Sequence, residues 1–156
     1  MRTFNGLEEL KAAVGEELGS SEWHEVTQTM VDQFAEATGD HQFIHVNEEM
    51  AKMTPFGGTI AHGFLTLSLL PQMAMKNADA PRLDGVKMGV NYGGNKVRFL
   101  APVPAGSRVR GRFKLLSAED KGGGRWLLKH ELTVEIEGGD KPALIAEWLT
   151  MQVVKA

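Results

Sequence analysis

The spacing of apolar residues changes near residue 85 of the chain. Before that point, apolar side chains in residues 7–18 and 27–38 recur every three or four positions, which predicts two amphipathic helices. Thr27 is expected to cap the second helix and Gly39 to end it, and a further short helix is expected to begin at Asn47. The positions that define the two helices are Leu7, Leu10, Val14 and Leu18 in the first and Met30, Val31, Phe34 and Ala35 in the second.

The segment 64–77, "FLTLSLLPQMAMKN", is apolar nearly all round. A helix of this composition is usually buried on every side. Pro71 lies in its middle and is expected to kink or divide the helix, because proline removes a hydrogen bond and clashes with the preceding turn. The segment therefore predicts a central helix inside the core.

After residue 85 the apolar period becomes two, which predicts β-strands. Residues 86–100 suggest two short strands around Gly93 and Gly94, and residues 108–116 and 125–137 each show one apolar and one charged face. Residues 143–154 are apolar on both faces, which favours a central strand. The predicted inner face comprises Val109, Phe113 and Leu115 in one strand and Trp126, Leu128, His130, Leu132, Val134 and Ile136 in the next.

Glycine-rich turns at 122–124 and 138–139 join these strands, which indicates an antiparallel sheet. A helix that is apolar all round and a sheet with one apolar face must bury each other. The pattern therefore predicts an α+β layered fold. The length suits a single domain over residues 1–156.

Composition excludes several classes of protein. The net charge of −3 argues against a nucleic-acid binder, whose footprint is a basic excess, and the lack of cysteine excludes disulfides and thiolate chemistry. The charged start of the chain does not resemble a signal peptide, and no apolar run approaches the ~20 residues that span a bilayer. We expect a soluble, cytoplasmic protein without a membrane segment.

The stretch "FAEATGDHQFIH", residues 34–45, places an acid and two imidazoles just after the expected helix end. Asp40 and His45 are five positions apart, so neither a helix nor a strand would aim both side chains at one point. An irregular loop can do so, and loops often carry functional groups. Taken singly, Asp40 also suits a turn residue and His45 a packed, hydrogen-bonded histidine.

With these elements, the chain resembles the hot-dog fold, in which a curved antiparallel sheet wraps a long central helix. More narrowly it resembles the MaoC-like dehydratases and (R)-specific enoyl-CoA hydratases, whose motif reads Gly-Asp, any residue, Asn-Pro, aliphatic, His. Residues 38–45, "TGDHQFIH", match that motif with Gln42-Phe43 in place of Asn-Pro, as in a subgroup related to nodulation protein N. The segments "GGTIAHGF" and "VRFLAPVPAGSRVR" also resemble the family.

The resemblance implies (R)-specific hydration of trans-2-enoyl-CoA to (R)-3-hydroxyacyl-CoA, or the reverse dehydration, without a cofactor. It assigns Asp40 and His45 to the reacting water and the N–H of Gly63 to the thioester oxygen. An ordinary Asp is a weak base, so an apolar enclosure by Phe43, Ile44 and Phe56 would help Asp40. The residues expected to contact the substrate are Gln42, Phe43, Phe56, Gly58, His62 and Arg98.

Other readings stay open. Acyl-CoA thioester hydrolysis and non-catalytic acyl-CoA binding are the alternatives to hydration. The basic stripe Arg108, Arg110, Arg112 and Lys114 suits coenzyme A phosphates less well than a solvated sheet face. His41 and His45 would suit a metal only on a continuous helix, so no metal is expected. The resemblance and the need to cover sheet edges favour a homodimer or a dimer of dimers.

Overall fold

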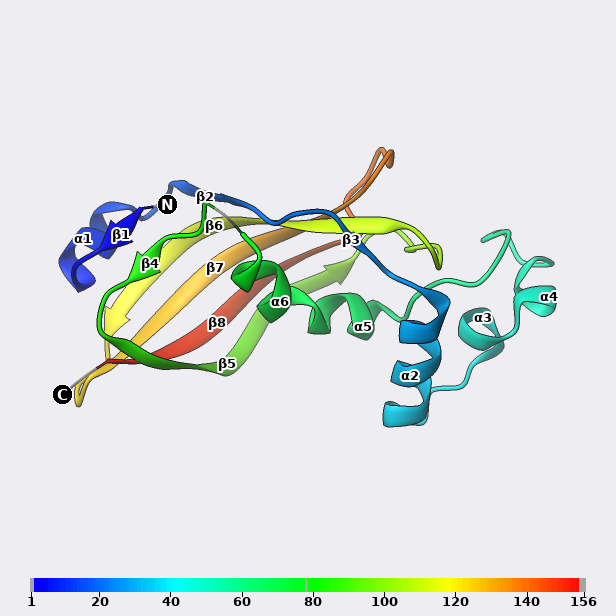
Figure 1. The fold of residues 1–156 in the computed structure, drawn as a ribbon, viewed down its shortest axis with the longest axis horizontal. Helices are drawn as coiled ribbons and strands as arrows, with labels where there is room; N and C mark the ends of the chain where they lie inside the picture. Colours follow the sequence, from blue (N-terminus) through cyan, green and yellow to red (C-terminus); the bar gives the residue numbers. More distant parts are fainter. Residues whose placement is uncertain (1, 78, 155–156) are drawn as a thin grey trace.

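The computed structural model describes residues 2–77 and 79–154, and four long antiparallel strands dominate it (Figure 1). They are β5 (Val86–Phe99), β6 (Arg108–Asp120), β7 (Arg125–Ile136) and β8 (Leu144–Val154). The sheet order is β2-β6-β7-β8-β5, where β2 is Glu17–Ser20, and β3 (His24–Glu25) also pairs with β6. The last strand, β8, lies between β7 and β5 and is central, as its apolar pattern predicted.

The two-residue alternation of β6 and β7 sets the inner face of the sheet. Val109 and Leu115 of β6 are fully buried, as are Leu132 and Val134 of β7. The predicted inner faces are thus confirmed. The prediction of two strands around Gly93 and Gly94 was wrong, because β5 runs through both glycines and keeps its pairing with β8 by means of local register shifts.

The central helix is divided, as Pro71 predicted. Helix α5 (Gly63–Ser68) ends before Leu69. Helix α6 (Leu70–Met75) begins directly after Leu69 and has Pro71 in its first turn. Figure 1 shows the two helices in line across the sheet. Gly111 on β6 lets α6 approach closely, since a Cβ there would lie 3.0 Å from the sulfur of Met73.

The N-terminal segment differs from its prediction. Helix α1 covers only Leu7–Ala12, and Glu17–Ser20 forms strand β2 instead of the expected last helical turn. Gly15 ends the helical path with a φ of 92°. Leu18 is buried all the same, from the strand. A separate pair of short parallel strands joins β1 (Thr3–Phe4) to β4 (Arg82–Leu83).

Three further helices lie at the N-terminal end of α5 (Figure 1). They are α2 (Gln28–Thr38), α3 (Phe43–Val46) and α4 (Glu48–Ala51). As predicted, the Thr27 side chain caps α2, Gly39 ends it with a left-handed φ of 82°, and Asn47 caps α4. Among the helices of the described chain, none combines the length and apolar character needed to cross a bilayer.

Candidate active site

The loop between α2 and α3 brings Asp40 and His45 together. Gly39 turns the chain out of α2, and the N–H of Gln42 donates to Oδ1 of Asp40 at 3.3 Å. Helix α3 then places His45 on its single turn. Oδ2 of Asp40 lies 4.0 Å from Nε2 of His45. One water can span this gap by donating one O–H to each atom at the usual ~2.8 Å.

The orientation of the His45 ring is set by its other nitrogen. Nδ1 lies 2.7 Å from the carbonyl oxygen of Ile60, which can only accept, so Nδ1 carries the hydrogen. In the neutral ring the lone pair is then on Nε2, facing Asp40. Gln28 fixes the backbone of His45 by donating to its carbonyl at 2.8 Å, and it accepts from the Thr59 hydroxyl at 2.6 Å. Sequence reasoning missed Gln28, since one polar residue in the first turn of a helix gives no signal.

His62 lies behind His45, away from the cavity surface. The two rings stack with centroids 3.8 Å apart and an interplanar angle of 23°, and the Phe34 ring lies 4.8 Å away from that of His62. Nε2 of His62 donates to the backbone oxygen of Asp40 at 2.9 Å. Its Nδ1 and the hydroxyl of Thr66 are buried without a partner in the described chain. His62 was expected to contact substrate, but its geometry is that of a residue that positions Asp40 and His45.

Gly63 lies at the start of α5 beside an apolar cavity of about 410 Å³. The first N–H groups of a helix have no partner within it, so the Gly63 N–H is available to a bound oxygen. A Cβ at Gly63 would lie 2.9 Å from the ring of Phe99, so the site requires glycine here. The cavity is lined by His45, Phe56, Ile60, Ala61, Gly63, Phe64, Thr66, Phe99, Leu100, Ala101, Pro102, Val103, Ala143 and Leu144.

The expected apolar enclosure of Asp40 is not formed by this chain alone. The Asp40 side chain is 52% exposed, and Phe43 and Phe56 are themselves exposed at 37% and 44%. Ile44 is only half-buried. The reason is that α2, α3 and α4 cover the end of the core without a further layer over them, so solvent reaches the carboxylate.

Of the residues expected to contact substrate, only Phe56 lines the cavity. Gln42, Phe43, Gly58 and Arg98 do not. Gly58 instead packs against Glu48. The carboxylate of Glu48 accepts hydrogen bonds from the backbone N–H and from the hydroxyl of Thr59. These two hydrogen bonds lower the pKa of Glu48, and the one from the backbone N–H has the larger effect. The guanidinium of Arg98 donates to the carbonyl of Val97.

The basic stripe on β6 proves to be an ion-paired outer face. Arg108 pairs with Glu137 and Arg110 with Glu135, while Arg112 bridges Glu135 and Glu17. The hydrogen bond to Glu137 raises the pKa of Arg108. Since Glu17, Glu135 and Glu137 already engage these guanidinium groups, a solvated outer face is favoured over a phosphate-binding site.

Asp40, His45 and His62 together have the composition of a metal site, with ligand-type atoms within 4.8 Å of one another. Their geometry does not fit one. The lone pairs of stacked imidazoles lie in nearly parallel planes and do not converge on a point. The Nε2–H of His62 is engaged by the Asp40 carbonyl. The trio is better suited to holding and moving a proton than to holding a cation.

A divided central helix against a curved antiparallel sheet, with an acid–imidazole pair at the helix start, defines a hot-dog protein with hydratase-like geometry. The MaoC-like domain model matches residues 9–135. The chain belongs to the MaoC-like family, which confirms the resemblance found in its sequence.

Curated relatives cover nearly the whole chain. The chain is 51% identical to "3-hydroxyacyl-thioester dehydratase Z" of Mycobacterium tuberculosis over 98% of its length and 99% of the relative's. It is 52% identical to "Nodulation protein N" of Rhizobium leguminosarum bv. viciae over 93% of the chain and 89% of that protein. The expected nodulation protein N-like subgroup is thereby confirmed.

The fold also matches a solved structure described as "Monoamine oxidase regulatory protein" from Archaeoglobus fulgius. The TM-score is 0.79 at 26% identity, and the match covers 99% of this chain and 98% of the other. This agreement in fold confirms both the α+β layered architecture expected from the apolar pattern and the hot-dog fold implied by the family resemblance.

Proposed function

We propose that the protein is a hydro-lyase that adds water to trans-2-enoyl thioesters, giving the (R)-3-hydroxyacyl product, and catalyses the reverse dehydration. The observation that carries the proposal is the 4.0 Å approach of Asp40 Oδ2 to the lone-pair nitrogen of His45, beside Gly63. Membership of the MaoC-like family and the dehydratase named among its close relatives support it.

In the hydration direction, Asp40 and His45 each accept a hydrogen bond from the same water molecule. The water oxygen forms a bond to the β-carbon as one of its protons passes to the dyad, with Asp40 the principal base. The same proton then goes to the α-carbon, so the atoms balance and no other reactant is needed. General acid–base groups of this kind contribute about 10²–10⁴ in rate. Because one water supplies both the hydroxyl group and the proton, both add to the same face of the double bond, and the addition is syn.

Negative charge develops on the thioester oxygen during this attack. The Gly63 N–H is the proposed donor to that oxygen, because it opens α5 at the cavity wall that His45 also lines. A donor placed this way is typically worth ~10²–10³ in rate. The apolar cavity walls suit an acyl chain carried on coenzyme A or acyl carrier protein.

A test of the function follows the loss of the conjugated enoyl absorbance of crotonyl-CoA and longer enoyl-CoAs with purified protein, with chiral analysis of the product. Hydration without thiol release supports the proposal. Release of free coenzyme A thiol without a hydroxyacyl product would indicate the thioesterase alternative. Calorimetric binding of the thioester without turnover would indicate the non-catalytic alternative.

We also propose that the working form is a homodimer, or a dimer of dimers, joined along β5. This edge strand is exposed over most of its length, and its exposed apolar side chains include Met88, Val90 and Tyr92. Joining two such edges would cover them and would add a wall near Phe99, which lines the cavity beside His45. Light scattering at micromolar concentration should give a mass of twice the 17.1 kDa chain mass, or four times it for a dimer of dimers, and a monomer would contradict the proposal.

The proposed location of the protein is the cytoplasm, and cell fractionation tests this proposal.

A further inference from the structure

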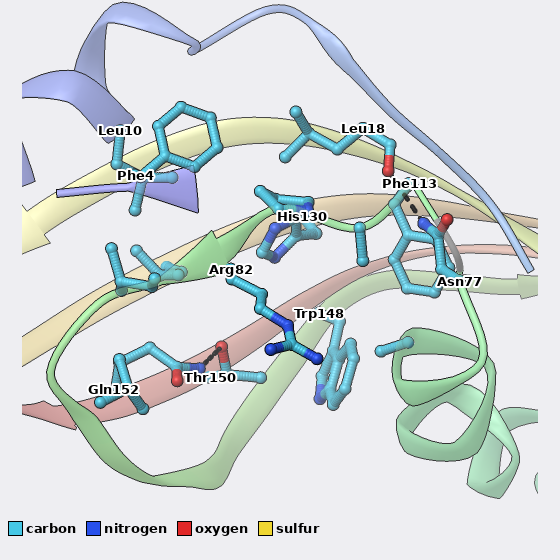
Figure 2. Close-up of a pocket in the computed structure, with 16 residues that line it drawn as sticks. Phe4, Leu10, Leu18, Asn77, Arg82, Phe113, His130, Trp148, Thr150 and Gln152 are labelled. Atoms are coloured by element: carbon cyan, nitrogen blue, oxygen red, sulfur yellow. Dashed lines mark hydrogen bonds between the residues drawn. The ribbon is translucent and has the colours of Figure 1, made fainter. Parts of the chain in front are cut away.

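A second cavity, of about 390 Å³, lies toward the other end of the central helix pair (Figure 2). Its walls come from the inner face of the sheet, from the N-terminal segment and from the connector that leads to β4. It shares no lining residue with the cavity beside His45. Along the central helix pair, Thr66 lines the first cavity and Ala74 lines the second, a separation of roughly 12 Å at the usual helical rise. The size is within the usual range for small-molecule sites.

Most of the cavity wall is apolar. The N-terminal segment contributes Phe4, Leu10 and Leu18, which cover the sheet residues Phe113 and Leu128. Phe4 and Leu10 are themselves almost fully buried, so this side of the cavity is firmly built. Such a wall suits an aliphatic body. Asn77 closes one side, where its amide donates to the carbonyl oxygen of Leu18 at 2.8 Å.

Arg82 brings a positive charge to the cavity. Figure 2 shows the guanidinium of Arg82 reaching from β4 toward Trp148, with Thr150 and Gln152 farther along β8. No acidic residue lines the cavity in the described part of the chain. The arginine–carboxylate pairs found among the described residues involve other arginines, so the positive charge of Arg82 has no such partner there.

His130 adds an imidazole to the lining of the same cavity. It interrupts the apolar inner face of β7, directly opposite Trp148 on β8. Burial lowers its pKa to about 4, so the ring is neutral at pH 7 and can donate one N–H. The residue is half-buried, and the hydrogen bonds of the described chain include none from its side chain, so its N–H is available to a ligand in the cavity. An anionic acceptor in the cavity would satisfy both His130 and Arg82.

We propose that this cavity is a binding site for an amphipathic monocarboxylate, a medium-chain fatty acid in its free form, distinct from the thioester site. The carboxylate is held by Arg82 with the N–H of His130 as a second donor. The aliphatic chain lies along Phe4, Leu18 and Leu128. Charge-assisted contacts of this kind are roughly twice as strong as neutral hydrogen bonds.

The test is titration calorimetry of the full-length protein with octanoate at pH 7, with 1-octanol and acetate as probes of the body and the head group alone. Octanoate should bind saturably and acetate should not. Arg82→Met keeps the aliphatic stem and removes the charge, so it should weaken octanoate binding at least tenfold and leave octanol binding unchanged. Arg108→Met, on the outer face, is the matched control and should bind octanoate as the wild type does.

Ala74→Phe fills the cavity from α6 and should abolish the binding of octanoate and octanol, with the fold checked by circular dichroism. NMR of histidine-labelled protein then locates the ligand. A bound carboxylate favours the protonated ring, so octanoate should raise the pKa of His130 above its value of about 4. Arg82 and His130 are the only titratable side chains among the described lining residues, which makes the signal specific.

Three results would overturn the proposal: no saturable octanoate binding by the folded wild type, equal octanoate affinity in Arg82→Met, or a ligand that perturbs His45 and His62 but leaves His130 unchanged. The last result would place the carboxylate in the catalytic cavity. None of these measurements requires turnover, so they are independent of the proposed hydro-lyase activity.

Discussion

The imidazole rings of His45 and His62 lie face to face, with centroids 3.8 Å apart. The Nδ1 of His45 donates to the Ile60 carbonyl, and the Nε2 of His62 donates to the Asp40 carbonyl. The His62 ring therefore holds the loop that carries the acid, while the Ile60 carbonyl fixes the ring of His45.

Asp40→Asn keeps the shape of the side chain and removes its basicity. We expect kcat for enoyl-CoA hydration to fall at least ~10²-fold with KM little changed. The His45→Gln substitution should lower kcat by a similar factor. The kcat of the double variant should be little lower than that of either single variant, because the pair acts as a unit. Steady-state kinetics on crotonyl-CoA measures this. An Asp40→Asn enzyme near the wild-type kcat, or an (S)-product, would refute the mechanism.

His62→Phe keeps an aromatic ring in the stack and removes the hydrogen bond to the Asp40 carbonyl. We expect kcat to fall about tenfold or more and the pH profile of kcat/KM to shift, because Asp40 is no longer held against His45. His41→Phe, at an exposed position, is the matched control and should behave as wild type. A His62→Phe enzyme with lower stability but an unchanged pH profile would reduce His62 to a packing residue.

Gly63 can be tested by separating its N–H from its small size. Gly63→Ala places a methyl group 2.9 Å from the Phe99 ring, so activity should fall, and adding Phe99→Ala should restore part of it. Gly63→Pro removes the N–H itself, so activity should fall by ~10²-fold or more and Phe99→Ala should not restore it. Circular dichroism controls for folding. Full activity in Gly63→Pro would end the assignment of its N–H to the thioester oxygen.

His130 should make the stability of the protein depend on pH. Its pKa is about 4 in the folded chain and near 6.5 in the unfolded chain, so the unfolded chain binds more protons between these values. The free energy of unfolding must then fall as the pH drops from 6.5 to about 4, by on the order of 3 kcal/mol. Urea unfolding at several pH values should show this loss in the wild type and less of it in His130→Leu. His41→Leu, used as the control, should retain the full loss.

Sequence periodicity predicted the parts of the fold whose side chains alternate between core and solvent. The faces of β6 and β7 were of this kind. The bounds of α2 were predicted from a different local signal, the capping residues Thr27 and Gly39. The prediction of one helix over residues 7–18 was wrong because Gly15 turns the chain out of α1. Leu18 is buried all the same, but as part of strand β2. β5 misled because its pairing with β8 carries it across the glycines, and pairing with a distant strand leaves no local pattern.

The site was predictable as far as it is local in sequence. The five-residue spacing of Asp40 and His45 pointed to a loop, and the structure has that loop. The stacking of His62 on His45 and the support from Gln28 depend on how α2 and α5 meet, which spacing along the chain does not encode. The exposure of Asp40 likewise depends on which layers cover the loop.

The residues proposed to carry the chemistry all lie within one stretch of 24 residues, namely Asp40, His45, His62 and Gly63. Three residues of the cavity wall, Phe99, Leu100 and Leu144, come from segments far from that stretch in the sequence. Only part of the cavity wall is therefore separable from the reacting groups, because Phe56, Ile60 and Phe64 lie in the same stretch of chain as those groups. Replacements at Phe99, Leu100 and Leu144 can reshape what the cavity accepts and leave the proton-transfer groups in register. Grafting residues 38–66 between MaoC-like chains would transfer the reaction together with half of the wall, and the recipient would keep the other half and its share of the substrate preference.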